Sequence, residues 1–296
     1  EQVSGPLGEP VQARLLRRGE LCMIESADAC GLHLVDPAQR NPLRASTYGV
    51  GELLRAAART RATHITIGLG GSATIDAGLG LAAALGWKFK NANGLQVEPI
   101  PAAMPMIASI EAPATAWRIP VTALADVRSP LFGVTGAARV FGPQKGADAR
   151  AIEQLDRGLE QVARVVERTL GVSLAGLEGG GAAGGLGAGI HVFLNAQLLR
   201  GAEWVLEQLH FDRLLNDARL VVTGEGSFDA QSSLGKITGE VIDRALARAV
   251  PVLLIAGSIK CAVATGVHAL SGHGASLTEE DLTHFAEQAS ARLLRH

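Results

Sequence analysis

The glycine-rich stretch at residues 65–80 carries residue types that can hold an anion. It reads Ile-Thr-Ile-Gly-Leu-Gly-Gly-Ser-Ala-Thr-Ile-Asp-Ala-Gly-Leu-Gly and ends near the carboxylate of Asp76. Glycines let a backbone approach a ligand closely, and a helix N-terminus presents unpaired N–H groups that favour anions. The pattern indicates an anion-binding corner, although a tight strand-to-helix turn would use the same residues. The candidate anion-binding residues are Gly70, Gly71, Ser72 and Thr74.

Two familiar phosphate-binding patterns fit this chain poorly. Residues 68–73 match G-x-G-x-x-A, but no acidic residue lies between Asp76 and Glu98, where a ribose-binding acid is expected about 20 residues on. Lys236 follows a glycine, but Ala230 stands where a Walker A sequence needs glycine. A phosphate role would therefore be of another type, and an NADP-dependent α/β oxidoreductase is a remote alternative.

A second cluster at residues 224–236 holds Glu225, Asp229 and Lys236 within a short span. Two carboxylates and a lysine can hold a divalent metal together with a phosphate, or supply a base and an electrostatic clamp. The structural alternative is that Asp229 caps the following segment while Glu225 pairs with Lys236 on the surface.

Two further segments offer charge or backbone donors. Asp126 follows an apolar run, and Lys145 lies between glycines, where it can act as a mobile cation for an acidic substrate or as a solvated loop lysine. The glycine run at 179–189 can form an anion nest or permit close packing of a helix. Its candidate ligand-binding members are Gly184, Gly185 and Gly187.

The composition excludes several classes of protein. The 296 residues carry a net charge of −2, with 47% hydrophobic and 19% charged residues, and so lack the basic stripe of a nucleic-acid-binding protein. The three cysteines have no C-x-x-C spacing, which argues against a disulfide framework or zinc site and favours a reducing cytosol. The longest uncharged run, residues 179–199, is too rich in glycine to span a membrane.

Apolar spacing predicts alternating strands and helices, which is typical of an α/β protein. A short apolar strand followed by a glycine turn with a hydroxyl occurs three times, and parallel strands of this kind gather their carboxyl ends around a ligand site. The predicted strands are 11–16, 21–26, 64–69, 121–127, 220–223 and 251–256. The predicted helices are 47–58, 76–85, 149–169, 202–209, 237–248 and 278–294.

Several of these segments together resemble the bacterial type I glycerate kinase family. They run in family order and their spacing makes a chance similarity negligible. The matching stretches are 4–8 (Ser-Gly-Pro-Leu-Gly), 26–32, 40–51, 68–80, 126–146, 182–189 and 223–236.

The resemblance implies a cytoplasmic kinase that phosphorylates D-glycerate with ATP and Mg²⁺, giving 2-phosphoglycerate or 3-phosphoglycerate. It also implies two α/β domains, one flavodoxin-like or Rossmann-like with a mostly parallel sheet and one smaller and mixed, with the active-site cleft between them. We expect residues 47–95 plus 216–296 to form the first domain and residues 1–46 plus 96–215 the second. We expect no nucleic-acid or membrane partner, and a homodimer is left open.

We assign roles by chemistry within this family. The ATP phosphates are expected at 70–74, with 184–187 as a second candidate, and Lys145 and Lys236 neutralise the substrate carboxylate or the transferring phosphate. Asp76 or Asp229 is expected to face the glycerate hydroxyl. The expected metal ligand is Glu225 or Asp126.

The chain departs from the family pattern at several positions. The family's opening Asp-Ser-Phe-Lys-Gly and Ala-Asp-Gly-Gly-Glu-Gly-Thr segments are not among these residues, so we expect the family's N-terminal part to be missing. Ile75 and Ala77 stand where the family prefers Asn and Gly, and Ser129 replaces an Asn. A truncated or catalytically impaired paralogue with a non-catalytic role is therefore the alternative function.

Overall fold

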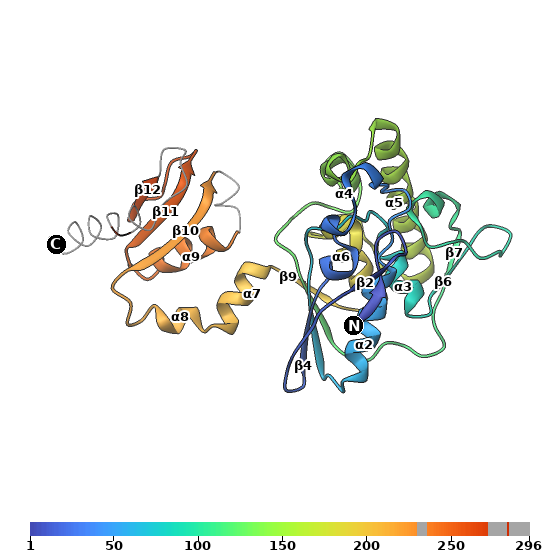
Figure 1. The fold of residues 1–296 in the computed structure, drawn as a ribbon, viewed down its shortest axis with the longest axis horizontal. Coiled ribbons are helices and arrows are strands. Elements are labelled where there is room, and N and C mark those ends of the chain that lie inside the picture. Colours follow the sequence, from blue (N-terminus) through green and yellow to red (C-terminus); the bar gives the residue numbers. More distant parts are fainter. Residues whose placement is uncertain (230–235, 272–282, 284–296) are drawn as a thin grey trace. The chain divides into compact units, whose positions relative to one another are not determined.

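The computed structural model describes residues 1–229, 236–271 and 283 and divides into two compact units, Glu1–Leu199 and Arg200–His296. Each unit has its own parallel or mostly parallel sheet, which confirms the predicted α/β class (Figure 1). Within the described part of the chain, no helix combines the length and apolar character that crossing a membrane requires.

The first unit is built on a five-stranded sheet with the order β3-β4-β5-β8-β9. The hairpin β3–β4 is antiparallel, and the remaining neighbours are parallel, so the carboxyl ends of β4, β5, β8 and β9 share one edge. These strands are β3 (Leu15–Arg18), β4 (Leu21–Glu25), β5 (His64–Gly68), β8 (Val121–Leu124) and β9 (Gln197–Leu199).

One face of this sheet carries the core because alternate residues of β4, β5 and β8 contribute buried apolar side chains to one cluster. In β5, Ile65 and Ile67 are fully buried and belong to the same cluster as Leu53 of α2, Leu81 of α3 and Ile190 of α6. The three helices that cover this face are α2 (Tyr48–Arg59), α3 (Leu79–Ala84) and α6 (Ala182–Leu194) (Figure 1).

A second apolar cluster lies around the long helix α5 (Ala149–Leu170), whose apolar side contacts η3 (Pro101–Met106). The other elements of this unit are β1 (Gln2–Ser4), β2 (Pro10–Gln12), α1 (Ala27–Cys30), η1 (Leu32–Leu34), η2 (Pro37–Gln39), β6 (Lys88–Lys90), β7 (Ser109–Glu111), α4 (Ala137–Phe141) and η4 (Pro143–Lys145). Two small antiparallel sheets, β1–β2 and β6–β7, were not predicted from the sequence.

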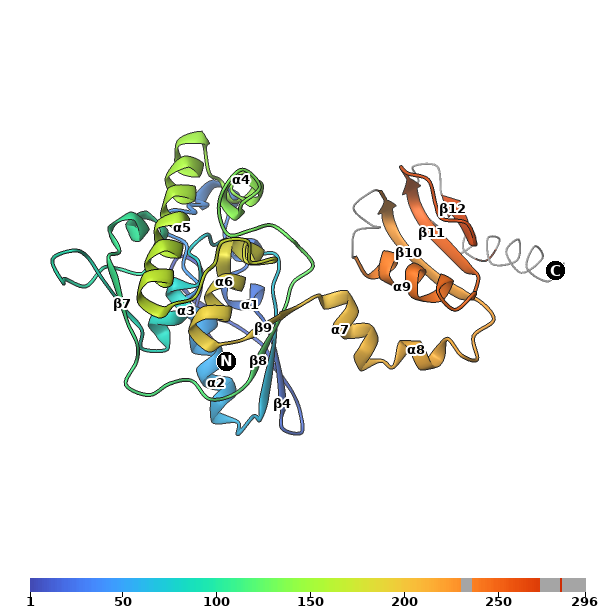
Figure 2. The same ribbon diagram turned by 180° about the vertical axis from the view of Figure 1, so that it is seen from behind.

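The second unit contains a fully parallel sheet of three strands with α9 packed on it (Figure 2). Val241 and Ile242 of α9 share a buried cluster with Val252 and Leu254 of β11. Its elements are α7 (Gly201–Gln208), α8 (Phe211–Leu214), β10 (Val221–Phe228), α9 (Ile237–Leu246), β11 (Val252–Ile259) and β12 (Val267–Ser271). The predicted helix 278–294 lies outside the described residues, apart from position 283.

The expected domain boundaries differ from these two units. The prediction joined residues 47–95 with 216–296, yet β5 pairs with β4 and β8 inside the first unit. Residues 99–120 also lie within that unit, where they form η3 and β7. The three strand–turn segments look alike in sequence, and an apolar pattern alone does not state which strands pair.

Several predicted element boundaries were wrong, including the strand 121–127, which ends at Leu124, and the strand 11–16, which is divided between β2 and β3. The helix predicted from Asp76 begins at Leu79, because Ala77 and Gly78 adopt left-handed conformations with φ of 53° and 71°. The strand predicted to end before Gly224 continues as β10 to Phe228, because its backbone pairs with β11 through Glu225 and again at Ser227 and Phe228.

Ala249 follows α9 with φ of 56° and is exposed, so an L side chain sits in a conformation that favours glycine. We expect Ala249→Gly to raise the free energy of unfolding of the second unit by about 1 kcal/mol. Native-state hydrogen exchange of the β11 amides measures this. The matched control is Ala247→Gly, at φ of −59°, which should lower stability; equal effects of the two changes would contradict the prediction.

Candidate active site

The loop after β5 presents a row of backbone donors at the carboxyl edge of the sheet. Gly71 accepts from the Leu32 N–H at 2.7 Å, and the Ala73 N–H donates to Cys30 at 2.7 Å, so the loop is fixed to α1 and η1. Within the described parts of the chain, no acceptor is bonded to the N–H groups of Gly70, Gly71 or Ser72. Gly70 and Gly71 are exposed, and a Cβ added to Gly70 would meet nothing within 4 Å.

Lys145 lies directly behind this loop. Its ammonium Nζ donates to Ser72 Oγ at 2.9 Å and to the Thr74 carbonyl at 2.8 Å, and the side chain is only 3% exposed. Burial lowers the pKa of Lys145 to about 8. The described residues offer no acceptor for the third proton of the ammonium, so a buried cation with a spare donor supports the loop.

Asp76 is fully buried and its carboxylate accepts four hydrogen bonds. Thr47 donates to Oδ2 through both its N–H and its Oγ1, each at 2.8 Å, and the Gly80 N–H donates to the same oxygen at 3.2 Å. The Gly78 N–H donates to Oδ1 at 3.0 Å. Burial raises the pKa of Asp76, whereas these donors oppose the rise. The carboxylate therefore joins the N-termini of α2 and α3.

Thr47 is a residue that the sequence analysis missed. Its Oγ1 donates to Asp76 and accepts from the Leu81 N–H at 3.0 Å, and it stands at the N-cap position of α2. A threonine just before a helical apolar pattern is a recognisable N-cap signal. Its bond to a carboxylate 29 residues away carries no such local signal.

The glycines of the 179–189 run serve close backbone packing. A Cβ at Gly184 would lie 1.9 Å from the Thr74 carbonyl oxygen, and one at Gly185 would lie 2.9 Å from the Cα of Ala77. A Cβ at Gly187 would lie 2.7 Å from the carbonyl oxygen of Gly179. All three are buried, so the start of α6 lies against the 74–78 segment. Of the two alternatives left open by the sequence, the contacts favour packing.

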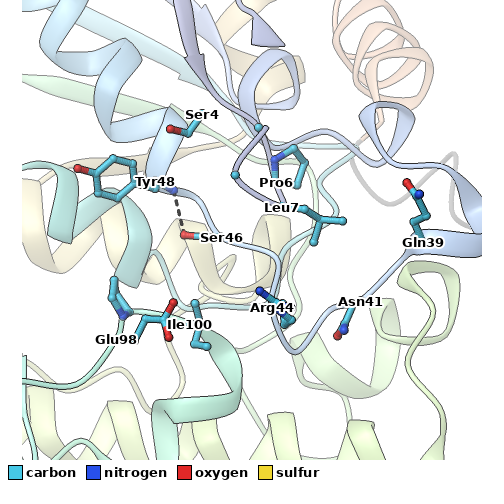
Figure 3. Close-up of a pocket in the computed structure, with 13 residues that line it drawn as sticks. Ser4, Pro6, Leu7, Gln39, Asn41, Arg44, Ser46, Tyr48, Glu98 and Ile100 are labelled. Carbon is cyan, nitrogen blue, oxygen red and sulfur yellow. Dashed lines mark hydrogen bonds between the residues drawn. The ribbon is translucent and has the colours of Figure 1, made fainter. Parts of the chain in front are cut away.

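A hollow of about 550 Å³ lies beside the N-terminus of α2, lined by residues 4–8, by parts of 39–48 and by 98–100 (Figure 3). The N-terminus of α2 is at the carboxyl edge of the sheet, because β5 follows that helix and runs back. The Ser46 hydroxyl accepts from the Tyr48 N–H at 3.2 Å, and Thr47 between them reaches Asp76. The hollow therefore adjoins the buried carboxylate.

Asp126 is exposed and follows β8 by two residues, so it also lies at the carboxyl edge of the five-stranded sheet. Arg40 links two other parts of this edge: its Nη1 donates to the Gln144 carbonyl at 3.0 Å, next to Lys145. Three segments thus lie at this edge: the loop after β5, the segment before α2, and the turn η4 that carries Lys145, which we call the lysine turn.

The second unit places its own candidates at the end of β10. Glu225 is half-buried on that strand, and its Oε1 is enclosed with no hydrogen-bond partner in the described structure. Asp229 follows the strand and is half-buried, and exposed Lys236 stands at the N-cap of α9. No group of three or more His, Cys, Asp or Glu in the described part gathers as a metal site.

Substitution of Gly184 tests the packing role of the glycine run. We expect Gly184→Ala to lower the free energy of unfolding by at least about 2 kcal/mol, because the added Cβ collides with a carbonyl and φ is 72°. Urea denaturation measures this. The control Gly70→Ala should stay within about 0.5 kcal/mol of the parent chain, and a similar loss in both variants would refute the distinction.

Comparison with known proteins places the chain in a family. The sequence model of the glycerate kinase family matches residues 1–294. Bacillus subtilis glycerate kinase is 43% identical over 262 residues, which are 87% of this chain and 69% of that protein, and Escherichia coli glycerate 2-kinase is 40% identical with the same coverage. A crystal structure from Salmonella typhimurium LT2, provisionally named glycerate kinase 2, is 40% identical and superposes with a TM-score of 0.80 over 99% of this chain and 79% of that one.

With nearly its whole length matched by one family, and with a shared fold at 40% identity, the chain belongs to the glycerate kinase family of phosphotransferases.

Proposed function

We propose that this chain transfers the γ-phosphoryl group of ATP to a hydroxyl of D-glycerate, giving 2-phosphoglycerate. The relatives' names support the acceptor, and their kinase activity supports a nucleoside triphosphate as donor. In the reaction the glycerate hydroxyl oxygen forms a bond to the γ-phosphorus, the bond from that phosphorus to the bridging oxygen breaks, and ADP leaves. The oxidoreductase alternative loses its support, since its only basis was a weak glycine pattern.

The observation that carries the proposal is the anion cradle of the loop after β5. Gly70, Gly71 and Ser72 offer N–H groups without an acceptor in the described structure, and Lys145 supports them from behind. Because a phosphate needs donors and positive charge at close range, we propose that the ATP phosphates bind here. The packing of Gly184, Gly185 and Gly187 against other backbone makes them a poorer candidate for the same task.

We propose Asp229 as the carboxylate that accepts the proton of the glycerate hydroxyl. A base must reach its substrate, and Asp229 is half-buried at the end of a strand. Asp76 is fully buried and already accepts four hydrogen bonds, which suits a positioning role. As a positioning residue, Asp76 holds the segment after the cradle against the N-termini of α2 and α3. Lys236, exposed at the start of α9, is proposed to neutralise a phosphate.

Mg²⁺ fits the carboxylates that the chain offers. Mg²⁺ is typically bound by one or two protein carboxylates together with substrate phosphates, so a cluster of three acids is not required. The enclosed Oε1 of Glu225, with no partner in the described residues, is a hard oxygen donor of the right kind. We propose Glu225, with Asp126 as the other candidate, as a magnesium ligand. When bound, the ion screens the charge of the phosphates.

Incubation of the full chain with ATP, Mg²⁺ and D-glycerate tests the function and the regiochemistry together. We expect ADP formation and one phosphoglycerate. In the ³¹P NMR spectrum, a phosphate on the secondary 2-carbon is split into a doublet by one proton, whereas a phosphate on the primary 3-carbon gives a triplet. A triplet would assign 3-phosphoglycerate instead.

The same assay separates the enzyme from the non-catalytic alternative. A chain that binds ATP and D-glycerate but forms no ADP would be an impaired paralogue. NADP serves as the control ligand, since a thermal shift with NADP and none with ATP–Mg²⁺ would revive the oxidoreductase.

Activity should depend on pH through Lys145. Below its pKa of about 8 the ammonium is protonated and supports the cradle, so we expect kcat/KM for ATP to fall as pH rises through about 8. Lys145→Met, which removes the charge, should lower kcat/KM about 100-fold and abolish that step of the profile. Stability changes the other way: the unfolded lysine titrates near 10.5, so the folded state gains stability between about pH 8 and 10.5. A wild-type profile that stays flat from pH 7 to 9 would contradict the role of Lys145.

A further inference from the structure

The hollow beside the N-terminus of α2 has a charge pattern that is suited to one kind of ligand. Arg44 and Glu98 are the charged side chains of its lining, and both are exposed toward solvent (Figure 3). No described residue forms an ion pair with the guanidinium of Arg44 or with the carboxylate of Glu98. The remaining polar groups include the amides of Gln39 and Asn41 and the hydroxyl of Ser46.

The one positive and one negative side chain of the lining argue against a polyphosphate as the ligand of the hollow. ATP carries several negative charges and would meet one arginine and one glutamate, whose charges cancel. A ligand with a single carboxylate and neighbouring hydroxyls fits better, because Arg44 can form a two-point contact with the carboxylate and Glu98 can accept from a hydroxyl. The hollow, at about 550 Å³, falls in the size range of small-molecule sites, roughly 300–1,000 Å³.

The buried residue Thr47 and the start of α3 join the hollow to the carboxyl edge of the sheet. Ser46 and Tyr48 line it, and Thr47 between them donates twice to Asp76. The start of α3 fits tightly here, because a Cβ on Gly80 would lie 2.2 Å from Ser46 Oγ and 2.6 Å from the Tyr48 nitrogen. The hollow therefore packs against the start of α3, which follows the anion cradle in the chain.

We propose that this hollow is the binding site of the hydroxy acid substrate, with Arg44 as the clamp for its carboxylate and Glu98 as an acceptor for a hydroxyl. The inference rests on the proposed function and names the site at which the acceptor binds. Lys145 and Lys236 are then left to the phosphates. Arg44 then becomes the residue that selects a hydroxy acid over a neutral polyol, because only the acid has a carboxylate for it to bind.

The chain contains one tyrosine, Tyr48, and it lines the hollow. Full-length protein labelled with 3-fluorotyrosine therefore gives one ¹⁹F resonance that reports on this place alone. Titration with D-glycerate, without ATP, should shift the resonance in a saturable way. Glycerol, which lacks the carboxylate, should shift it far less at the same concentration. A resonance that D-glycerate leaves unmoved would overturn the inference.

Steady-state kinetics then locate the carboxylate contact. We expect Arg44→Gln to raise KM for D-glycerate about 10- to 100-fold while KM for ATP stays within about twofold, because the lost contact is a charge-assisted hydrogen bond. Arg44→Lys should recover part of the loss, since it restores the charge without the two-point geometry. The matched control is Arg164→Gln, an exposed arginine on α5 outside the hollow, which should match the parent chain.

Each outcome decides one of the two proposals. Turnover of D-glycerate by the parent chain with an unchanged KM in Arg44→Gln would overturn this site and leave the proposed function standing. Absence of turnover in the parent chain would refute the proposed function, and the assignment of the hollow to its acceptor would fall with it. A rise of both KM values together would show general damage and contradict the specific clamp. Glu98→Gln should raise KM for D-glycerate by a smaller factor.

Discussion

The buried carboxylate of Asp76 is the interaction on which the arrangement of the site depends. A fully buried charge is tolerated only when donors surround it, and here four hydrogen bonds from three residues do so. Those donors come from the start of α2 and from the turn that leads into α3. Loss of the carboxylate would leave these donors without an acceptor. The anion cradle, the lysine turn and the hollow all adjoin the segments that this one group holds.

The glycines around Asp76 are of two kinds: some are required by close packing, and others are not. Gly184 and Gly185 are required because neighbouring backbone occupies the space of a side chain, at Thr74 and at Ala77. Gly70 is free of such contacts, so the fold alone does not explain why a side chain is absent there. A glycine that packing does not need, next to unused N–H groups, is what close approach of a ligand requires. The two kinds look the same in the sequence.

Local patterns predicted the amphipathic helices α5 and α9 well because amphipathic spacing is a local property, whereas the glycine-rich helix α6 was not predicted. The prediction of 149–169 is confirmed by α5, and that of 237–248 by α9 with a slightly earlier end. Strand partners could not be predicted, since the apolar run at 64–69 is compatible with either sheet. The end of β10 was misplaced because Gly224 suggests a turn, whereas its pairing with Ile255 of β11 keeps it extended. Pairing between distant segments decides both cases.

The candidate site shows the same limit. The sequence singled out Lys145 and Ser72 separately, but only the fold brings the lysine ammonium onto the serine hydroxyl, 73 residues away. This contact places the lysine in buried surroundings, which changes its pKa. A lysine in a solvated loop would keep its ordinary pKa, whereas burial behind the cradle lowers the pKa to about 8. The cradle thereby gains a cation that water does not screen, and electrostatic attraction for a phosphate is strongest in such surroundings. The hollow, with its opposed Arg44 and Glu98, lacks that positive excess, so one edge of the sheet offers separate places for a polyphosphate and for a monoanionic hydroxy acid.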